Sequence, residues 1–247
     1  METISNHKPK IVVIGSCNTD MVVKANRLPV PGETILGGTF YMNPGGKGAN
    51  QAIAASRLGA EVTFISKIGY DLFGLQALEI YKSEKINTEF IFTDQKSPSG
   101  VALISVDSFG ENSIIVAPGA SRSLSIEDIN KAEEIIKESN IILMQLEVPI
   151  ETAEYAATIA NKYGKKVILN PAPASTLSDS FLNNVHTILP NRIEAEMLSG
   201  IKVMDIESAH RAAIAIGEKG IENVVITLGK DGSYVKEKDK YTMIPAK

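Results

Sequence analysis

The stretch Pro44-Gly45-Gly46-Lys47-Gly48-Ala49-Asn50-Gln51 is a glycine-rich turn that opens onto a small-residue helix over 52–58 and stops at Gly59. Its closely spaced glycines let the backbone approach a ligand, and the helix N-terminus behind them offers unpaired N–H groups. The pattern predicts a binding loop for hydroxyl or phosphate groups. The alternative is a turn that only permits a tight start of the helix. The stretch is not a Walker A loop, because Gly48 follows Lys47 where Ser or Thr is needed.

A small separate sheet is predicted on both sides of this stretch. Segments 21–25 and 34–40 have the pattern of strands, and Pro29-Val30-Pro31-Gly32 joins them without a helix. This arrangement predicts a hairpin outside the main core. Two further extended segments, 101–106 and 113–116, can pair with that hairpin in one small sheet.

The rest of the chain alternates between strands and helices. Strands are predicted at 11–15, 62–68, 141–145, 166–170, 187–189, 223–228 and 241–244, and helices at 71–84, 125–138, 150–163, 178–183, 192–198 and 205–219. This rhythm predicts an α/β fold with a doubly wound, mostly parallel sheet flanked by helices. We expect one such domain over 1–247.

Composition limits the classes of function. The net charge is -4 and is spread along the chain, so nucleic acid and acidic membranes are not expected partners. The first ten residues hold no apolar core, and no apolar run approaches the ~18 residues of a membrane span, so we expect a soluble cytoplasmic protein. The single Cys17 rules out an internal disulfide, and the three histidines lack the spacing of metal ligands.

Polar residues follow four of the predicted strands. They are Asn18-Thr19-Asp20, Glu147, Asn170, and Asn191 with Glu194. Each has a structural alternative as a turn former, a solvated loop residue or a helix cap; Glu194 stands at the third helical position after Asn191, as a capping box requires. Because ligands bind at the carboxyl ends of parallel strands, the four clusters together predict one polar crevice.

These motifs carry a resemblance that runs from about Lys10 to the last residue. The chain resembles the ribokinase group of the PfkB carbohydrate kinase family at 15–20, 31–34, 45–52, 144–147, 170–174, 190–196 and 227–229. The resemblance implies ATP-dependent phosphorylation of the 5-hydroxyl of D-ribose, with Mg²⁺ on the nucleotide. Deoxyribokinase, another PfkB sugar or nucleoside kinase, and a sugar-binding module without catalysis remain the alternatives.

The resemblance also implies roles for individual residues. The sugar would contact Asn18, Thr19, Asp20, Gly46, Lys47, Gly48, Ala49, Asn50 and Glu147. ATP would contact Asn191, Thr227, Leu228, Gly229, Lys230, Asp231 and Gly232. Glu194 would act through water on Mg²⁺ and phosphate. Arg192, inside the Asn-x-x-Glu pattern, receives no role.

One family motif is not found in this sequence. A Gly-Ala-Gly-Asp loop, which would supply the catalytic aspartate and the anion hole, is expected after strand 241–244, and the sequence ends at Lys247. We therefore expect a C-terminally truncated kinase that is inactive alone, with the catalytic residue and the K⁺ ligands of the complete enzyme lying after Lys247. The small sheet, inserted at about 20–41 and 100–117, is expected to be a lid over the sugar and the contact of a homodimer.

Overall fold

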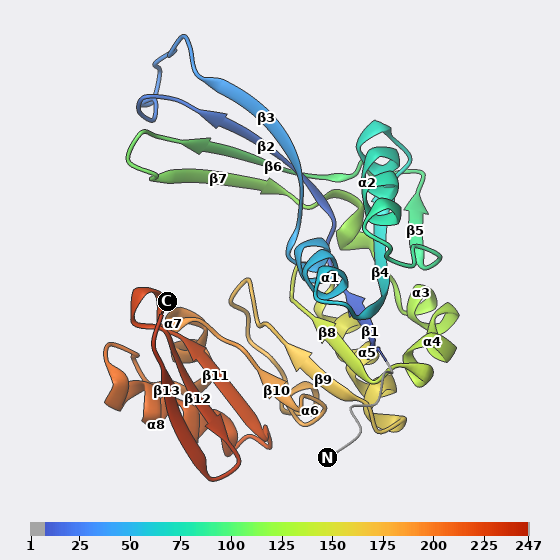
Figure 1. The fold of residues 1–247 in the computed structure, drawn as a ribbon, viewed down its shortest axis with the longest axis vertical. Helices are drawn as coiled ribbons and strands as arrows, with labels where there is room; N and C mark the ends of the chain where they lie inside the picture. The colour runs from blue at the N-terminus through green and yellow to red at the C-terminus, as the bar shows by residue number, and fades with distance from the viewer. Residues whose placement is uncertain (1–7, 247) are drawn as a thin grey trace.

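The computed structural model describes residues 8–246 and contains two sheets (Figure 1). The large sheet has nine strands in the order β13-β12-β11-β10-β9-β8-β1-β4-β5. The small sheet has four strands in the order β3-β2-β6-β7. The predicted α/β architecture with a separate small sheet is confirmed.

The large sheet is parallel from β5 across to β11, and the last two strands are antiparallel. Its strands are β1 (Lys10–Ile14), β4 (Glu61–Gly69), β5 (Ile91–Asp94), β8 (Ile141–Met144), β9 (Lys166–Leu169), β10 (Thr187–Ile188), β11 (Asn223–Thr227), β12 (Ser233–Glu237) and β13 (Lys240–Ile244). The small sheet contains β2 (Asn18–Lys24), β3 (Thr39–Gly45), β6 (Gly100–Val106) and β7 (Asn112–Ala117).

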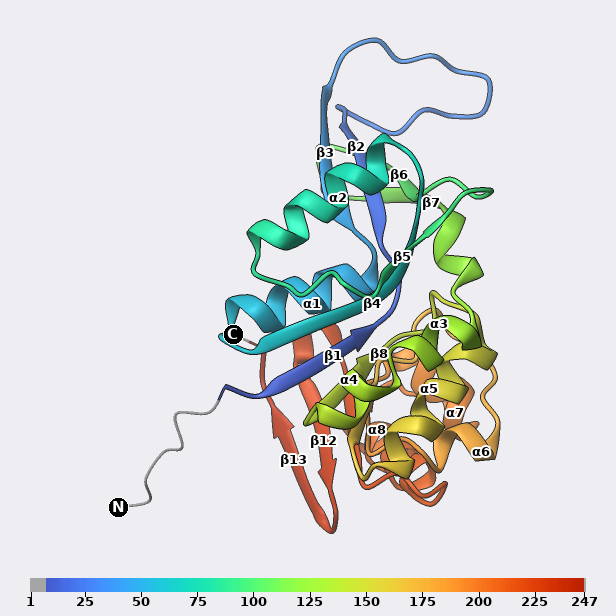
Figure 2. The same cartoon turned by 90° about the vertical axis from the view of Figure 1, so that its right-hand side faces the viewer.

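Helices cover both faces of the large sheet. They are α1 (Lys47–Arg57), α2 (Leu72–Ser83), α3 (Ile126–Lys131), α4 (Glu133–Glu138), α5 (Ile150–Lys162), α6 (Asp179–Leu182), α7 (Arg192–Ser199) and α8 (Ile206–Gly217), with 3-10 turns η1 (Gly119–Ser123) and η2 (Gly229–Asp231). Figure 2 shows α1 and α2 on one side of β1 and β4, with α3 to α8 on the other side.

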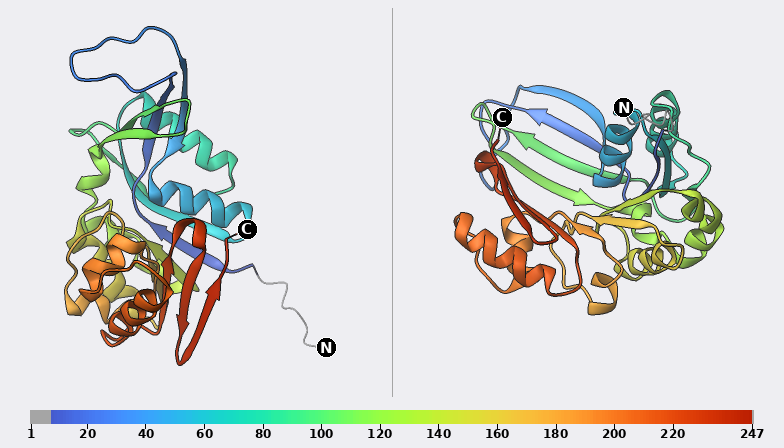
Figure 3. Two further views of the ribbon diagram at one scale, coloured as in Figure 1. Left: turned by 90° about the vertical axis from the view of Figure 1, so that its left-hand side faces the viewer. Right: turned by 60° about the horizontal axis from the view of Figure 1, so that its bottom comes forward.

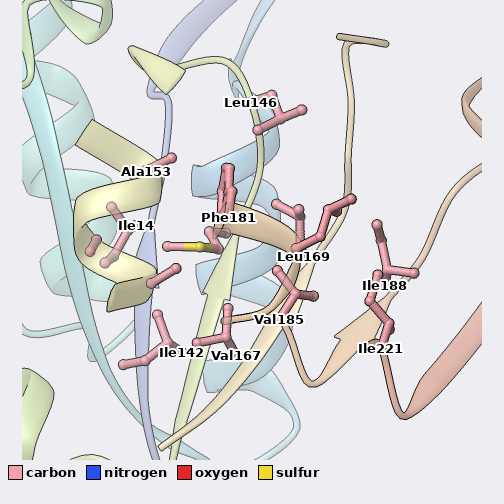
Figure 4. Packing of buried hydrophobic residues seen from close by; sticks show 14 of the residues in the cluster. Ile14, Ile142, Leu146, Ala153, Val167, Leu169, Phe181, Val185, Ile188 and Ile221 are labelled. Carbon is pink, nitrogen blue, oxygen red and sulfur yellow. The ribbon is translucent and has the colours of Figure 1, made fainter. Parts of the chain in front are cut away.

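Alternate residues of the parallel strands pack in two buried hydrophobic clusters, one on each face of the sheet, as expected for a sheet covered on both faces. Ile14, Leu169 and Ile188 belong to the larger cluster, which α5 and α6 help to close (Figure 4). The smaller cluster lies under α1 and α2 and includes Ala52 of α1 and Phe64 of β4, both fully buried. The small residues of α1 thus serve close packing on the sheet.

The third strand and the first helix differ from the predicted boundaries. Strand 34–40 was predicted, but β3 runs from Thr39 to Gly45, because it pairs with β2 down to the Asn18–Gly45 register position. Pro44 is tolerated because β3 is an edge strand. Helix α1 begins at Lys47, with Gly46 as its N-cap at a φ of 89°. Most of the predicted glycine-rich turn is therefore strand end and first helical turn.

Three smaller differences concern local segments. The predicted helix 125–138 is interrupted at Ala132, which ends α3 and precedes α4. Strands β5 and β12 were not predicted, because each presents only one buried apolar side chain, Ile91 and Tyr234 respectively, and so lacks a clear pattern.

The small sheet extends away from the large one (Figures 1 and 3). Its predicted single-sheet pairing is confirmed, with β2 between β3 and β6. Large apolar side chains are exposed on it, among them Phe40 (58%) and Ile115 (69%).

Candidate active site

A cavity of about 890 Å³ lies at the carboxyl ends of the central parallel strands, beside the start of α1 and the end of β7. The predicted site residues in its lining are Asn18, Lys47, Asn50, Glu147, Asn191, Glu194 and Thr227. The structure thus brings predicted sugar-side and nucleotide-side residues together around one cavity.

The carboxylate of Glu147 stands at the N-terminus of α1. Its Oε2 accepts from the backbone N–H of Lys47 at 3.0 Å and from the hydroxyl of Ser16. The Lys47 ammonium lies 3.3 Å from Oε1 of Glu147. Because no side chain of α1's own N-cap bonds to the helix, Glu147 supplies both an acceptor and a negative charge where the helix dipole favours them.

Two glycines make close contacts near this carboxylate, Gly48 with the backbone and Gly45 with the side chain of Asp20. A Cβ on Gly48 would lie 2.7 Å from the backbone of Gly15 and Ser16, so only glycine lets α1 start against the end of β1. A Cβ on Gly45 would lie 2.0 Å from Oδ1 of Asp20, so the carboxylate of Asp20 occupies the space that this glycine leaves open.

Asp20 is partly buried on β2 and lies beside the cavity rather than in its lining. Burial raises the pKa of its carboxyl above the ordinary value, the negative charge of Glu147 raises it further, and Lys47 opposes both. Asp20, Glu147 and Lys47, all predicted to contact the sugar, therefore form one electrostatic group.

Two amides of the lining have oxygens whose hydrogen-bonding capacity is not used. Oδ1 of Asn18 and Oδ1 of Asn170 are buried and have no partner among residues 8–246. A buried polar atom without a partner costs free energy, and a hydrogen bond from a ligand hydroxyl or water removes that cost.

On the other side of the cavity, Asn191 and Glu194 form the capping box of α7. The Asn191 side chain accepts from the Glu194 N–H at 2.9 Å, and Oε2 of Glu194 accepts from the Asn191 N–H at 2.8 Å. Asn191 and Glu194 therefore cap the helix, which was the structural alternative to a binding role, and both residues also line the cavity. Burial raises the pKa of the Glu194 carboxyl, against the Asn191 N–H and the charge of Lys47, which lower it.

The remaining predicted nucleotide residues form a tight turn. Thr227 joins this turn to α7 through its N–H, which donates to the Pro190 carbonyl at 2.9 Å. Gly229 and Gly232 have φ values of 65° and 101°, which side chains rarely adopt. Of the predicted site residues, those outside the cavity lining are Thr19, Asp20, Gly46, Gly48, Ala49, Leu228, Gly229, Lys230, Asp231 and Gly232.

The lining contains residues that the sequence did not single out. Ser16 and Gln51 each lie within a quoted motif, beside predicted site residues, and this adjacency was the available signal. Arg122 lies in η1, where no element was predicted, and only the folded chain brings it to the cavity.

A bound metal would need ligands from outside the protein. Within residues 8–246, no group of three or more His, Cys, Asp or Glu side chains could hold a metal ion. Glu194 offers one carboxylate, and Mg²⁺ is commonly held by one or two carboxylates together with substrate phosphates and water. The donor set therefore fits a metal that arrives with a nucleotide. No helix in the same part of the chain is long and apolar enough to cross a membrane.

The sequence model of the pfkB family carbohydrate kinases matches residues 8–247. The chain belongs to the PfkB family of carbohydrate kinases. Curated PfkB-type relatives are similar over most of the chain. Ribokinase of Haemophilus influenzae is 46% identical over 234 residues, which cover 95% of this chain and 76% of that protein. Deoxyribokinase of Salmonella typhi is 37% identical over 237 residues, which cover 96% and 78%.

A solved PfkB-type structure has the same fold. The ribokinase of Arabidopsis thaliana, complexed with ribose and ATP, superposes with a TM-score of 0.85 at 29% identity, covering 97% of this chain and 78% of that one. The family match and the shared fold together assign this chain to the carbohydrate kinases.

Proposed function

We propose that the chain belongs to a cytoplasmic ribokinase that transfers the γ-phosphoryl group of ATP to the 5-hydroxyl of D-ribose. The observation that carries the proposal is the single cavity that joins Asn18, Lys47, Asn50 and Glu147 to Asn191, Glu194 and Thr227. Phosphoryl transfer requires the acceptor hydroxyl and the nucleotide to meet in one space, and a single cavity lined by both sets of residues supports this proposal.

On the sugar side, the amides of Asn18 and Asn50 and the carboxylates of Asp20 and Glu147 would bind hydroxyls. A fixed array of such groups discriminates between epimers, because the wrong sugar leaves buried groups unpaired. Oε2 of Glu147 already accepts from two protein donors, which leaves Oε1, beside the Lys47 ammonium, for a sugar hydroxyl.

On the nucleotide side, Asn191 and the turn after Thr227 would contact ATP, and Glu194 would hold Mg²⁺ through water. When bound with ATP, the ion would neutralise charge on the phosphoryl groups. Buried Glu194 and the nearby Lys47 would orient the metal-nucleotide complex toward the sugar. K⁺ activation of the complete enzyme is part of the same proposal.

The proton acceptor is proposed to lie outside residues 8–246. Glu147 is engaged by Ser16 and Lys47, and Asp20 is already assigned to the sugar hydroxyls in this proposal. A general base contributes about 10²–10⁴ in rate, so residues 1–247 alone should bind ribose with little turnover.

The test of this function is a coupled ADP-release assay with ATP and Mg²⁺ on two proteins, residues 1–247 and a version extended to the length of the relatives. We expect turnover of the extended version with ribose, several orders of magnitude above that of residues 1–247. Faster turnover with 2-deoxyribose would assign the chain to the deoxyribokinases. No turnover of any pentose by the extended version would favour a sugar-binding module, and equal turnover of both proteins would place the base within 1–247.

A further inference from the structure

The guanidinium of Arg192 connects three segments on the nucleotide side. Its Nη2 donates to Oδ2 of Asp231 at 2.8 Å and to the carbonyl of Leu228 at 3.3 Å. Its Nη1 donates to the carbonyl of Val203 at 3.4 Å, in the segment between α7 and α8. One side chain thus ties the start of α7 to the turn after β11 and to the segment before α8.

The turn that Arg192 contacts is short and connects the antiparallel strands β11 and β12. It runs over 228–232, where the Leu228 N–H donates to the Gly232 carbonyl at 2.8 Å and the Gly232 N–H to the Gly229 carbonyl at 3.0 Å. These bonds lie within the turn, while the pairing of β11 with β12 holds its two ends and Leu228 is buried in the core. Gly229 and Gly232, both at positive φ, give the middle of the turn conformational freedom, so the contacts of Arg192 add to what the strand pairing holds.

Arg192 follows Asn191 directly in the chain, but the two side chains line different hollows of the surface. Asn191 lines the cavity and caps α7, whereas Arg192 and Asp231 line a second hollow beside it. Thr227 is bridged to Asn191 just before the turn begins. Arg192 therefore sets the position of 228–232 relative to the same helix start that carries Asn191 and Glu194.

We propose that Arg192 is a positioning residue for the nucleotide: it holds the turn 228–232 at a fixed distance from Asn191 and Glu194, so that a nucleoside triphosphate meets both at once. This inference rests on the proposed function. An exposed ion pair alone would contribute little, but Arg192 also donates to two carbonyls, and its planar guanidinium suits several fixed acceptors at once.

The test measures ATP affinity and ribose affinity by calorimetry on the protein and its Arg192→Ala variant. We expect ATP affinity to fall roughly 10-fold in the variant, as expected when a charged donor to fixed acceptors is lost, with ribose affinity unchanged. The matched control is Arg57→Ala, which breaks a similar exposed pair with Glu84 at the end of α1 and should leave ATP affinity unchanged. Arg192→Lys, which keeps one charged donor, should recover part of the loss.

A double-mutant cycle separates positioning from direct contact. If Arg192 and Asp231 act as one unit, Arg192→Ala with Asp231→Ala should weaken ATP binding no more than the stronger single change. Additive losses would show that Asp231 meets the nucleotide independently and would overturn the proposal.

Amide hydrogen exchange decides the point without any ligand. Exchange over 228–232 should be faster in Arg192→Ala than in the parent protein, while exchange over β9 stays the same. Unchanged exchange over the turn, or unchanged ATP affinity, would overturn the proposal. Failure of the parent protein to bind ATP would instead contradict the proposed function, and the exchange result would still decide whether Arg192 holds the turn.

Discussion

The backbone N–H of Lys47 donates to Oε2 of Glu147 at 3.0 Å, although the two residues lie 100 positions apart in the chain. The contact joins the start of α1, which follows β3 of the small sheet, to the loop after β8 in the central sheet. It makes one carboxylate both a helix cap and a candidate sugar ligand, so stability and binding are coupled at Glu147.

Glu147→Gln should weaken both properties. The change removes the charge that faces the Lys47 ammonium and the α1 N-terminus, and we expect about 1–2 kcal/mol less free energy of unfolding together with weaker ribose binding. Chemical denaturation and ribose calorimetry measure the two effects. Glu89→Gln, at an exposed turn position outside the helices, is the control and should change neither. An unchanged unfolding free energy for Glu147→Gln would show that the charge at this cap contributes nothing.

Gly48→Ala should destabilise the fold by about 1–3 kcal/mol, because the added Cβ would overlap the backbone at the end of β1, which cannot yield as a flexible side chain would. Thermal unfolding measures the loss. Ala54→Ser, on the exposed side of α1, should stay within about 0.5 kcal/mol of the parent. Equal stability of Gly48→Ala and the parent would mean that the start of α1 shifts freely.

Asp20→Asn should stabilise the ligand-free protein at neutral pH. The folded protein raises the Asp20 pKa, so the ionised carboxylate costs stability above that raised pKa, and the cost disappears as pH falls toward the unfolded value. The stability advantage of Asp20→Asn should therefore shrink on acidification. Denaturant titrations at neutral and acidic pH test this, and a variant less stable than the parent at neutral pH would contradict it.

The same aspartate should matter for the sugar and not for the nucleotide. Asp20→Ala and Asn50→Ala should each weaken ribose binding by about 1.5–3 kcal/mol and leave ATP binding nearly intact, because the nucleotide-side residues come from other strand ends. Calorimetry with each ligand measures both affinities. Unchanged ribose affinity in both variants would remove these residues from the site.

The small sheet should form a homodimer contact. Exposed apolar side chains such as Phe40 and Ile115 would be buried if two such sheets packed together, which favours pairing in water. Light scattering at micromolar concentration should give a dimer mass, and Ile115→Asp should give a monomer. A monomer mass for the parent protein would contradict this prediction.

Much of the fold was predictable because apolar runs identify parallel strands buried on both faces. The start of α1 was not predictable from the sequence, because Gly48 has low helix propensity and the cap comes from the distant Glu147. The position of β3 was also not predictable, because Asn43, Pro44 and Gly45 are poor strand formers. Pairing with β2 holds these residues in the extended conformation.

The candidate site was predictable where residues follow strand ends, as with Asn18 and Asn191, because parallel strands bring those ends together. The contacts of Ser16 and Arg192 were not predictable from the sequence. Ser16 donates to Glu147 and Arg192 donates to Asp231, and only the tertiary structure brings these partners near.

The central claim is that the cavity at the strand ends holds ribose. The most direct measurement is a calorimetric titration of D-ribose into the protein, beside the same titration of Asn50→Ala and of D-arabinose, which differs at one hydroxyl. We predict saturable binding of ribose that is at least 10-fold weaker in Asn50→Ala, and at least 10-fold weaker binding of arabinose to the parent protein, as expected when buried polar groups lose a partner. No saturable ribose binding, or equal affinity for both pentoses, would contradict the account.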